Sequence, residues 1–385
     1  MTQSYLSKKY KALNYYSSIY WEWIKQGTFA NYIKYKVLLY KFGATQIFIG
    51  PYFASLGGVS HHMQSIHQFT THRNCLLPQP SFLEFLHRHN LTSTYKQYVY
   101  TINFGQRILH SHVDPWFISV CERAQQEGAK WVHTNHTMYF EQDWDEGLAP
   151  WQLAINKALV EEAKKADVNI AIAHWLKAFL KEQYQIDTIY IPNGVNVGKC
   201  DEADAQRFTN RYKLNDFILF ASGISDIKNA GAFLKLAQAI PDKPFVIIGR
   251  GISKEALNQK FNVPIGDNLI ILGNMEHPDL LDAIAACKVF VVTSRSEGLP
   301  TVLMEAMALR RSVVGVNTYG TKEVINSDKY GYLYEADNFN DLVKKTQAAY
   351  AYSKGDKARQ RILQEYDWRV IIPQIDAVYQ NLIDG

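Results

Sequence analysis

The sequence has no run of consecutive apolar residues long enough to cross a membrane, which takes roughly 18 or more. Residues 1–11 are polar and then aromatic, so they do not resemble the apolar stretch and small-residue cleavage site of a secretory signal. Apolar residues make up 47% of the chain, which lies in the globular range. We therefore expect a cytoplasmic protein that is soluble or peripherally bound at the inner face of a membrane.

The chain has few cysteines and a small net charge. The four cysteines, Cys75, Cys121, Cys200 and Cys287, form neither a CxxC pair nor a zinc-type spacing. We therefore predict buried or incidental thiols and no metal or redox centre built from them. The net charge is only +4, which argues against a broad nucleic-acid-binding surface.

Short apolar runs alternate with helical stretches along most of the chain. A length of 385 residues favours two domains. Strands begin at residues 46–50, and the pattern restarts at residues 217–221, after Pro192-Asn193-Gly194. Repeated strand and helix units of this length predict parallel sheets covered on both faces. The predicted fold class is α/β, with two facing Rossmann-like doubly wound domains that bind ligands at the carboxyl ends of their strands.

Nicotinamide oxidoreductases share sheets of this kind. Their phosphate-binding loop has the pattern GxGxxG directly after a strand. Here Gly57-Gly58 and Gly249-Arg250-Gly251 are both too short to match it. The sequence therefore disfavours that class.

One stretch in the second half combines two acids with a glycine and a proline. Glu297 and Glu305 are separated by seven residues, and Gly298 and Pro300 shape the turn before a helix predicted from Thr301. The first N–H groups of a helix have no partner within it, so they could receive a diphosphate or a sugar hydroxyl. The spacing alone is common, and it also fits one solvated acid and one acid at a helix start.

The surrounding sequence is more specific. Residues 294–308, Ser-Arg-Ser-Glu-Gly-Leu-Pro-Thr-Val-Leu-Met-Glu-Ala-Met-Ala, closely resemble the donor-site signature of family-four retaining glycosyltransferases of the GT-B fold (glycosyl transferases group 1). Further matches occur in the order that the family shows. They are Gly57-Gly58, His136-Thr137, Ile191-Pro192-Asn193-Gly194-Val195, Lys228-Asn229 and residues 249–251 and 320–323. The resemblance spans residue 46 to the C-terminus and is looser in the first half.

The resemblance implies a role for each matched residue. Glu305 would hold the ribose hydroxyls of a nucleotide and Glu297 the donor sugar, while Lys228 would neutralise the leaving diphosphate. His136 would lie across the cleft near the sugar, although a lone histidine is more often structural. The implied catalytic residues are Glu297, His136 and Lys228. The implied donor-binding set is Gly57, Gly58, Lys228, Arg250, Gly298, Leu299, Pro300, Thr301 and Glu305.

The resemblance also implies a reaction. A sugar would pass from a nucleotide-diphosphate sugar to a glycan or lipid-linked acceptor, as in polysaccharide biosynthesis, with retention of anomeric configuration. No nucleophile is obvious on the other sugar face, so we favour attack on the same face as the leaving group. We expect neither a cofactor nor a metal ion.

We predict four segments along the chain. A helical, aromatic and basic extension covers residues 1–44, and an acceptor-side Rossmann-like domain covers residues 45–195. A donor-binding Rossmann-like domain covers residues 196–370. A C-terminal helix at residues 371–385 returns to the first domain.

One position departs from the family pattern. Family members usually carry an arginine five residues before the lysine that contacts the diphosphate, and here that position is Gly223. Arg250 after the next strand is our candidate for the missing charge, and a solvated loop arginine is an equally good interpretation. The departure supports an alternative function, a catalytically silent nucleotide-sugar-binding relative that acts as a partner or regulatory subunit. Retention of Glu297, Glu305 and Lys228 favours an active enzyme.

Asp143-Trp144-Asp145 has the form of an acidic metal-binding pair. It follows His136 in the first domain, whereas the phosphates should lie on the second. We therefore expect a loop that is solvated or faces the acceptor.

Residues 1–42 combine lysine with aromatic side chains. The residues concerned are Lys8, Lys9, Lys11, Lys25, Lys34, Lys36 and Lys41, with Trp21 and Trp23. Such a surface suits an anionic membrane face. A helical extension packed on the first domain, with solvated lysines, fits equally well.

Overall fold

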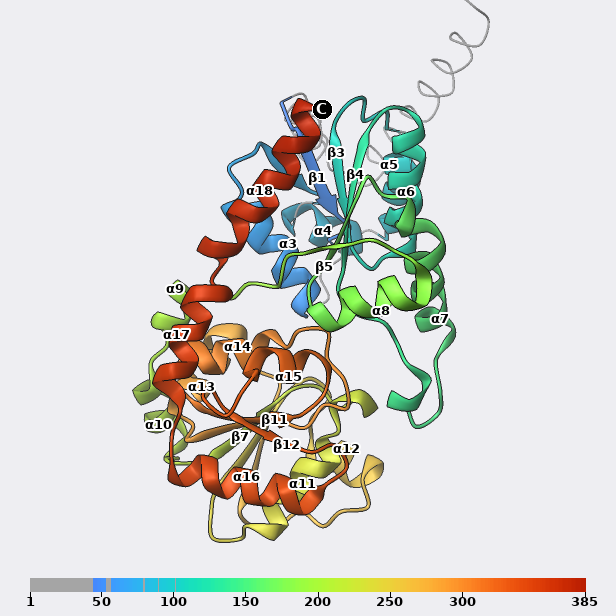
Figure 1. Cartoon of the computed structure of the whole chain (residues 1–385). Coiled ribbons are helices and arrows are strands. Elements are labelled where there is room, and N and C mark those ends of the chain that lie inside the picture. The colour runs from blue at the N-terminus through green and yellow to red at the C-terminus, as the bar shows by residue number, and fades with distance from the viewer. Residues whose placement is uncertain (1–43, 53–56, 79, 89, 101) are drawn as a thin grey trace, which may run out of the picture.

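The computed structural model describes residues 44–385 except 53–56, 79, 89 and 101 (Figure 1). The predicted N-terminal extension therefore lies, up to Gly43, outside the described residues. Two six-stranded sheets are present, and every strand pair in them is parallel. The predicted pair of doubly wound α/β domains is confirmed. Across the described ranges, no helix combines the length and the apolar character that crossing a membrane requires.

The first sheet has the order β2-β1-β3-β4-β5-β6. Its strands are β1 (Ile47–Gly50), β2 (Asn74–Leu76), β3 (Ile108–Ser111), β4 (Lys130–Asn135), β5 (Val168–Ala171) and β6 (Ile189–Tyr190). Its helices are α3 (Gly58–Phe69), α4 (Pro80–Arg88), α5 (Thr92–Tyr100), α6 (Pro115–Gln126), α7 (Pro150–Lys157) and α8 (His174–Tyr184). Successive residues of a strand point to opposite faces. Phe48 accordingly enters one apolar cluster while Ile47 and Ile49 enter another.

The second sheet has the order β12-β11-β10-β7-β8-β9. Its strands are β7 (Ile218–Ala221), β8 (Phe245–Ile248), β9 (Leu269–Gly273), β10 (Val289–Val292), β11 (Ser312–Val316) and β12 (Tyr332–Tyr334). Its helices are α9 (Val197–Asp201), α10 (Ala205–Tyr212), α11 (Ala230–Ala239), α12 (Lys254–Lys260), α13 (His277–Ala286), α14 (Thr301–Ala308), α15 (Tyr319–Ile325), α16 (Phe339–Ala351) and α17 (Gly355–Glu365). The runs Phe-Val-Ile-Ile of β8 and Val-Phe-Val-Val of β10 are buried throughout, as expected of strands covered on both faces.

The chain crosses between the domains at two adjacent places. Val195 N–H donates to the carbonyl of Tyr366 (2.7 Å), and Trp368 N–H donates to the carbonyl of Val195 (3.2 Å). A Cβ at Gly194 would lie 2.5 Å from the Trp368 ring, so only glycine fits there. After the second crossing, α18 (Trp368–Asp384) runs along the first domain and packs on α3 (Figure 1).

The helical segment that precedes β5 is interrupted. It consists of α7, a π-helical turn at Ala158–Glu162 and a 3₁₀ turn at Ala163–Lys165. The side-chain amides of Asn169 and Gln125 donate to the carbonyls of Ala163 and Lys165. These side-chain partners satisfy the last carbonyls and end the helix before β5.

Candidate active site

The strand orders fix where the candidate residues meet. In the second sheet the chain turns from β9 back to the other side of β7, so the loops after β7 and β10 diverge around one crevice. Lys228 follows β7 and Glu297 follows β10. Arg295 N–H donates to the carbonyl of Ile227 (2.7 Å), which ties the two loops together.

Glu297 is held by two donors on one oxygen. Lys228 Nζ lies 2.6 Å and Ser294 Oγ 2.7 Å from its Oε1. The other carboxylate oxygen, Oε2, has no hydrogen-bond partner among the described residues. Thr293 Oγ1 donates to the carbonyl of Lys228 (3.1 Å) and fixes the turn that carries the lysine. The loops thus bring together Lys228 and Glu297, which are 69 positions apart in the sequence.

Gly298 is closely packed between the two domains. A Cβ at this position would lie 2.0 Å from the His136 carbonyl oxygen of the first domain. A Cβ at Gly320 would lie 2.1 Å from the Gly298 carbonyl oxygen, and that oxygen accepts a 2.8 Å hydrogen bond from Trp175 Nε1. Glu323 accepts from the first N–H groups of α8 and so joins the domains a second time. Glycine is required at 298 and 320 for this close approach.

Glu305 lies on α14, one turn beyond the start of this helix at Thr301. His277, the first residue of α13, places Nε2 at 2.7 Å from Glu305 Oε1. The hydrogen bond with Glu305 is the main reason why the pKa of His277 is raised. Both residues line a pocket with His61, Lys199 and Thr301. This pocket lies between the two domains, since His61 belongs to α3 of the first domain.

Two helix N-termini face each other at this pocket. Gly58 begins α3 and Thr301 begins α14, and a Cβ at Gly58 would lie 3.7 Å from Thr301 Oγ1. At Gly57, no atom of the described chain lies within 4 Å of an added Cβ, so packing does not require glycine there. Both helices direct their partial positive charge towards the same place, which favours an anion. Leu299 is buried and Pro300 is the N-cap of α14.

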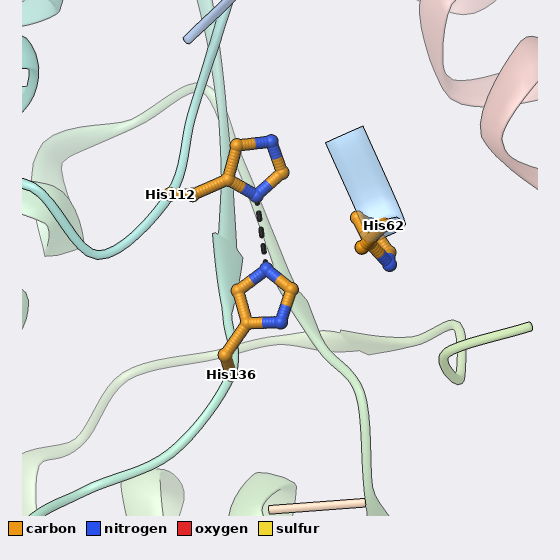
Figure 2. Close-up of side chains that lie close together, drawn as sticks. All are labelled: His62, His112 and His136. Atoms are coloured by element: carbon orange, nitrogen blue, oxygen red, sulfur yellow. Dashed lines mark hydrogen bonds between the residues drawn. The ribbon is translucent and has the colours of Figure 1, made fainter. Parts of the chain in front are cut away.

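His136 is buried in a cluster of histidines (Figure 2). Its Nε2 lies 2.9 Å from His112 Nδ1, and the His62 ring stands beside both. Burial lowers the pKa of His136 and His112 well below the usual value and that of His62 to about 4, so all three rings are neutral. Neither ring nitrogen of His62 has a hydrogen-bond partner among the described residues.

These three histidines form the one group of metal-ligand side chains that converges within the described part of the chain. Their ligand nitrogens lie within 4.8 Å of one another. His112 and His136 already share a hydrogen bond, so the rings would have to turn before all three could bind one ion. The spacing of these residues in the sequence does not indicate the cluster, because they come from α3 and from the ends of β3 and β4.

The loop with Asp143 and Asp145 contacts the second domain, although the Asp145 side chain itself is 59% exposed. Asp143 is buried and accepts a hydrogen bond from Ser296 Oγ, and burial raises its pKa. Asp145 pairs with Arg295 Nη1 at 2.7 Å. Asp145 is therefore solvated as expected, whereas Asp143 is not, because the loop reaches across the cleft to the residues just before Glu297. A role of this loop towards the acceptor stays a prediction.

Arg250 lies beside the position where the family arginine is missing. Its carbonyl accepts a hydrogen bond from Ile224 N–H (3.3 Å) and would lie 3.6 Å from a Cβ at Gly223. The Arg250 side chain is exposed. Its contact with a donor stays a prediction.

The four cysteines are buried and free, as predicted. Burial raises the pKa of Cys287 to about 12, which makes this thiol unreactive at neutral pH. The cysteines therefore contribute no chemistry to the cleft.

Two protein families match most of the chain. The family described as glycosyl transferases group 1 matches residues 201–365, and glycosyltransferase family 4 matches residues 61–199. A putative teichuronic acid biosynthesis glycosyltransferase of Bacillus subtilis is 26% identical over 180 residues, 45% of this chain and 44% of the relative. The poly(ribitol-phosphate) alpha-N-acetylglucosaminyltransferase of Staphylococcus aureus is 24% identical over 263 residues, 65% of this chain and 50% of the relative. The chain spans about half the length of these curated relatives.

Solved structures show the same architecture. Anabaena HepE, determined with UDP and glucose, superposes with a TM-score of 0.68 over 87% of this chain and 99% of its own. At 17% sequence identity this likeness shows the fold alone. It is the two-domain GT-B arrangement, with a cleft between the sheets.

Proposed function

Because the chain belongs to the glycosyl transferases of group 1, which have the GT-B fold, we propose that it transfers a hexose or related sugar from a nucleotide-diphosphate sugar, with retention of configuration. The proposed acceptor is a glycan or a lipid-linked saccharide. The named activity of the Staphylococcus aureus relative, transfer of a sugar to a polymer, supports this choice. The UDP and glucose held by HepE in its solved complex support the donor class.

The pairing of Lys228 with Glu297 is the observation on which the proposal rests. Breaking a glycosyl–phosphate bond builds negative charge on the diphosphate and positive charge on the anomeric carbon. Lys228 and the N-terminus of α14 would stabilise the diphosphate, and Glu297 Oε2 would hold a sugar hydroxyl. Without a donor the two side chains neutralise each other at 2.6 Å, which keeps both in the crevice.

The proposed step occurs on one face of the sugar. The acceptor oxygen bonds to the anomeric carbon as the bond from that carbon to the phosphate oxygen breaks, and the phosphate oxygen takes the acceptor proton. The backbone carbonyl of His136 contacts Gly298, and its ring, which burial keeps neutral, would orient the sugar without carrying a charge. Because no charged metal is needed for these roles, turnover should be unchanged after dialysis against a strong chelator. Complete loss that Mg²⁺ restores would contradict this.

Purified protein incubated with a panel of nucleotide sugars and a saccharide acceptor tests the proposal directly. We expect release of nucleoside diphosphate that depends on the acceptor. Gly223 favours one other function, a catalytically silent nucleotide-sugar-binding partner. Tight nucleotide binding with no release from any donor would support that alternative and contradict the enzyme.

The membrane-side proposal concerns residues 1–42, of which the structure describes none. Their lysines and tryptophans would bring the cleft to a lipid-linked acceptor. The full chain should float with anionic liposomes, and a chain lacking residues 1–42 should not. Equal behaviour of the two proteins would leave the packed helical extension as the better account.

A further inference from the structure

The carboxylate expected to bind ribose has a partner that the sequence did not indicate. His277 Nε2 lies 2.7 Å from Glu305 Oε1, between the first residue of α13 and the middle of α14. The side chains of His277 and Glu305 are 30% and 14% exposed. Oε2 of Glu305 has no hydrogen-bond partner among the described residues. The carboxylate is thus fixed at one oxygen, and its other oxygen can still accept hydrogen bonds.

Three charged or titratable groups face His277, each from a different element. Glu305 lies on α14, His61 on α3 and Lys199 on α9. The rings of His61 and His277 are 5.0 Å apart and inclined at 39°. Burial lowers the pKa of His61, and His277 lowers it further, while Glu305 raises the pKa of His277. Of the two rings, His277 is the one whose protonated form the surroundings favour, because it lies next to the acid.

Resting on the proposed function, we propose that His277 is a positioning residue, which holds the Glu305 carboxylate in the orientation that receives the two ribose hydroxyls of the nucleotide. A glutamate side chain loses rotamer freedom when it binds a ligand in one geometry. The His277 hydrogen bond imposes that loss before the nucleotide arrives. Wild type should then prefer a ribonucleotide over a nucleotide that lacks the 2′ and 3′ hydroxyls. This preference should be stronger than in a variant whose Glu305 has no partner at position 277.

The location of the pair supports this role. Gly58, Thr301 and Glu305 line the same pocket as His277, and the N-termini of α3 and α14 meet there. A diphosphate at those helix ends would leave its nucleoside to extend along α14 towards Glu305, since Glu305 lies one turn further along that helix. His277 contacts only Oε1 of the acid, so Oε2 stays available for the hydroxyls.

The test compares nucleotides that differ only in the two hydroxyls. Binding of UDP, GDP, ADP and CDP to the full chain is measured by calorimetry, and the tightest is compared with its 2′,3′-dideoxy counterpart. The proteins are wild type, His277→Ala and His277→Gln, with His87→Ala as a control because His87 is exposed on α4, which does not line the pocket. His277→Asn, too short to reach Glu305, replaces the alanine variant if that variant does not fold.

We expect wild type and His87→Ala to prefer the ribonucleotide over the dideoxynucleotide by at least about tenfold. His277→Ala should lose most of that preference while it binds the dideoxynucleotide nearly as well as wild type. His277→Gln, whose amide N–H can take the place of Nε2, should keep most of it. An unchanged preference in His277→Ala would overturn the positioning role. If no nucleotide binds to wild type, the proposed function itself fails, and the inference fails with it.

Discussion

Glu297 and Glu305 are eight positions apart, yet their surroundings differ. Glu297 is held by the Lys228 ammonium and by a serine hydroxyl. Glu305 is held by His277, whose pKa is raised mainly by the hydrogen bond with this acid. Each acid uses only Oε1 and keeps Oε2 for a ligand. The difference suggests a division of work, in which the Glu297 end stabilises the charges of the reaction and the Glu305 end holds a part of the donor that does not react.

The largest effect should come from removing the lysine at the Glu297 end. Lys228→Ala should lower kcat by roughly hundredfold or more, because one preorganised donor to a developing anion contributes about that much. KM for the donor should change less, because the charge develops only in the transition state.

Steady-state kinetics and thermal unfolding of Lys228→Ala would be measured together. Lys288→Ala is the matched control, because Lys288 pairs with Asp216 in the same domain, at the ends of β7 and β10 that lie away from the crevice. A wild-type kcat in a folded Lys228→Ala protein would contradict the proposal that the Glu297 end stabilises the charges of the reaction.

The second largest effect should come from Gly298→Ala, which would hinder closure of the two domains. Gly298→Ala would place a methyl group 2.0 Å from the His136 carbonyl, so one domain must move away from the other. A displacement of about 1 Å at a reacting centre can reduce turnover by up to about hundredfold. We expect kcat to fall at least tenfold with little change in the melting temperature.

Gly57→Ala provides the contrast, since a Cβ there meets no described atom of the chain within 4 Å. Any loss in that variant should be in donor affinity and not in closure. Small-angle scattering with and without donor would show whether Gly298→Ala still closes, and full closure at a wild-type rate would contradict the argument.

Arg250 tests whether the diphosphate has a second cation. Arg250→Ala should weaken donor binding by about tenfold, the value of one hydrogen bond to a charged group. The same measurement on Arg211→Ala, an exposed arginine of α10 that pairs weakly with Asp279, is the control. Equal donor affinity in wild type and Arg250→Ala would show that Arg250 does not replace the arginine that family members carry at the position of Gly223.

The smallest effect should be a pH dependence at the Glu305 end. The folded-state pKa of His277 is raised, so the charged pair exists below that pKa and is lost as the pH rises through it. Because the ordinary pKa of histidine is about 6.5, donor affinity should fall by about threefold above this pH, within the range measured for partly exposed ion pairs. Titration with an intact nucleotide sugar avoids the ionisation of a terminal phosphate. In His277→Gln the affinity should not vary over this pH range, and a wild-type slope in that variant would assign the titration to another group.

The sequence predicted the sheets well because buried parallel strands are continuous apolar runs, such as residues 245–248 and 289–292. The family resemblance implied that Lys228 and Glu297 belong to one donor site, and the structure brings them together because both follow strands in one doubly wound sheet. The partners of the other residues could not be predicted. His277 meets Glu305, and Asp143 meets Ser296, through the packing of helices and loops, for which no periodic pattern exists.

The return of α18 to the first domain has a consequence for synthesis. Ile47 and Ile66 lie in one apolar cluster with Ile371 and Ile375, so the first domain is completed by residues made only after the whole second domain. At about 5–20 residues per second, β1 waits roughly 15 to 60 seconds for this helix. The second domain is one continuous stretch and can fold as soon as it is made. The domain that is synthesised first is therefore the one that finishes folding last, and until then it exposes an apolar face that a chaperone would recognise.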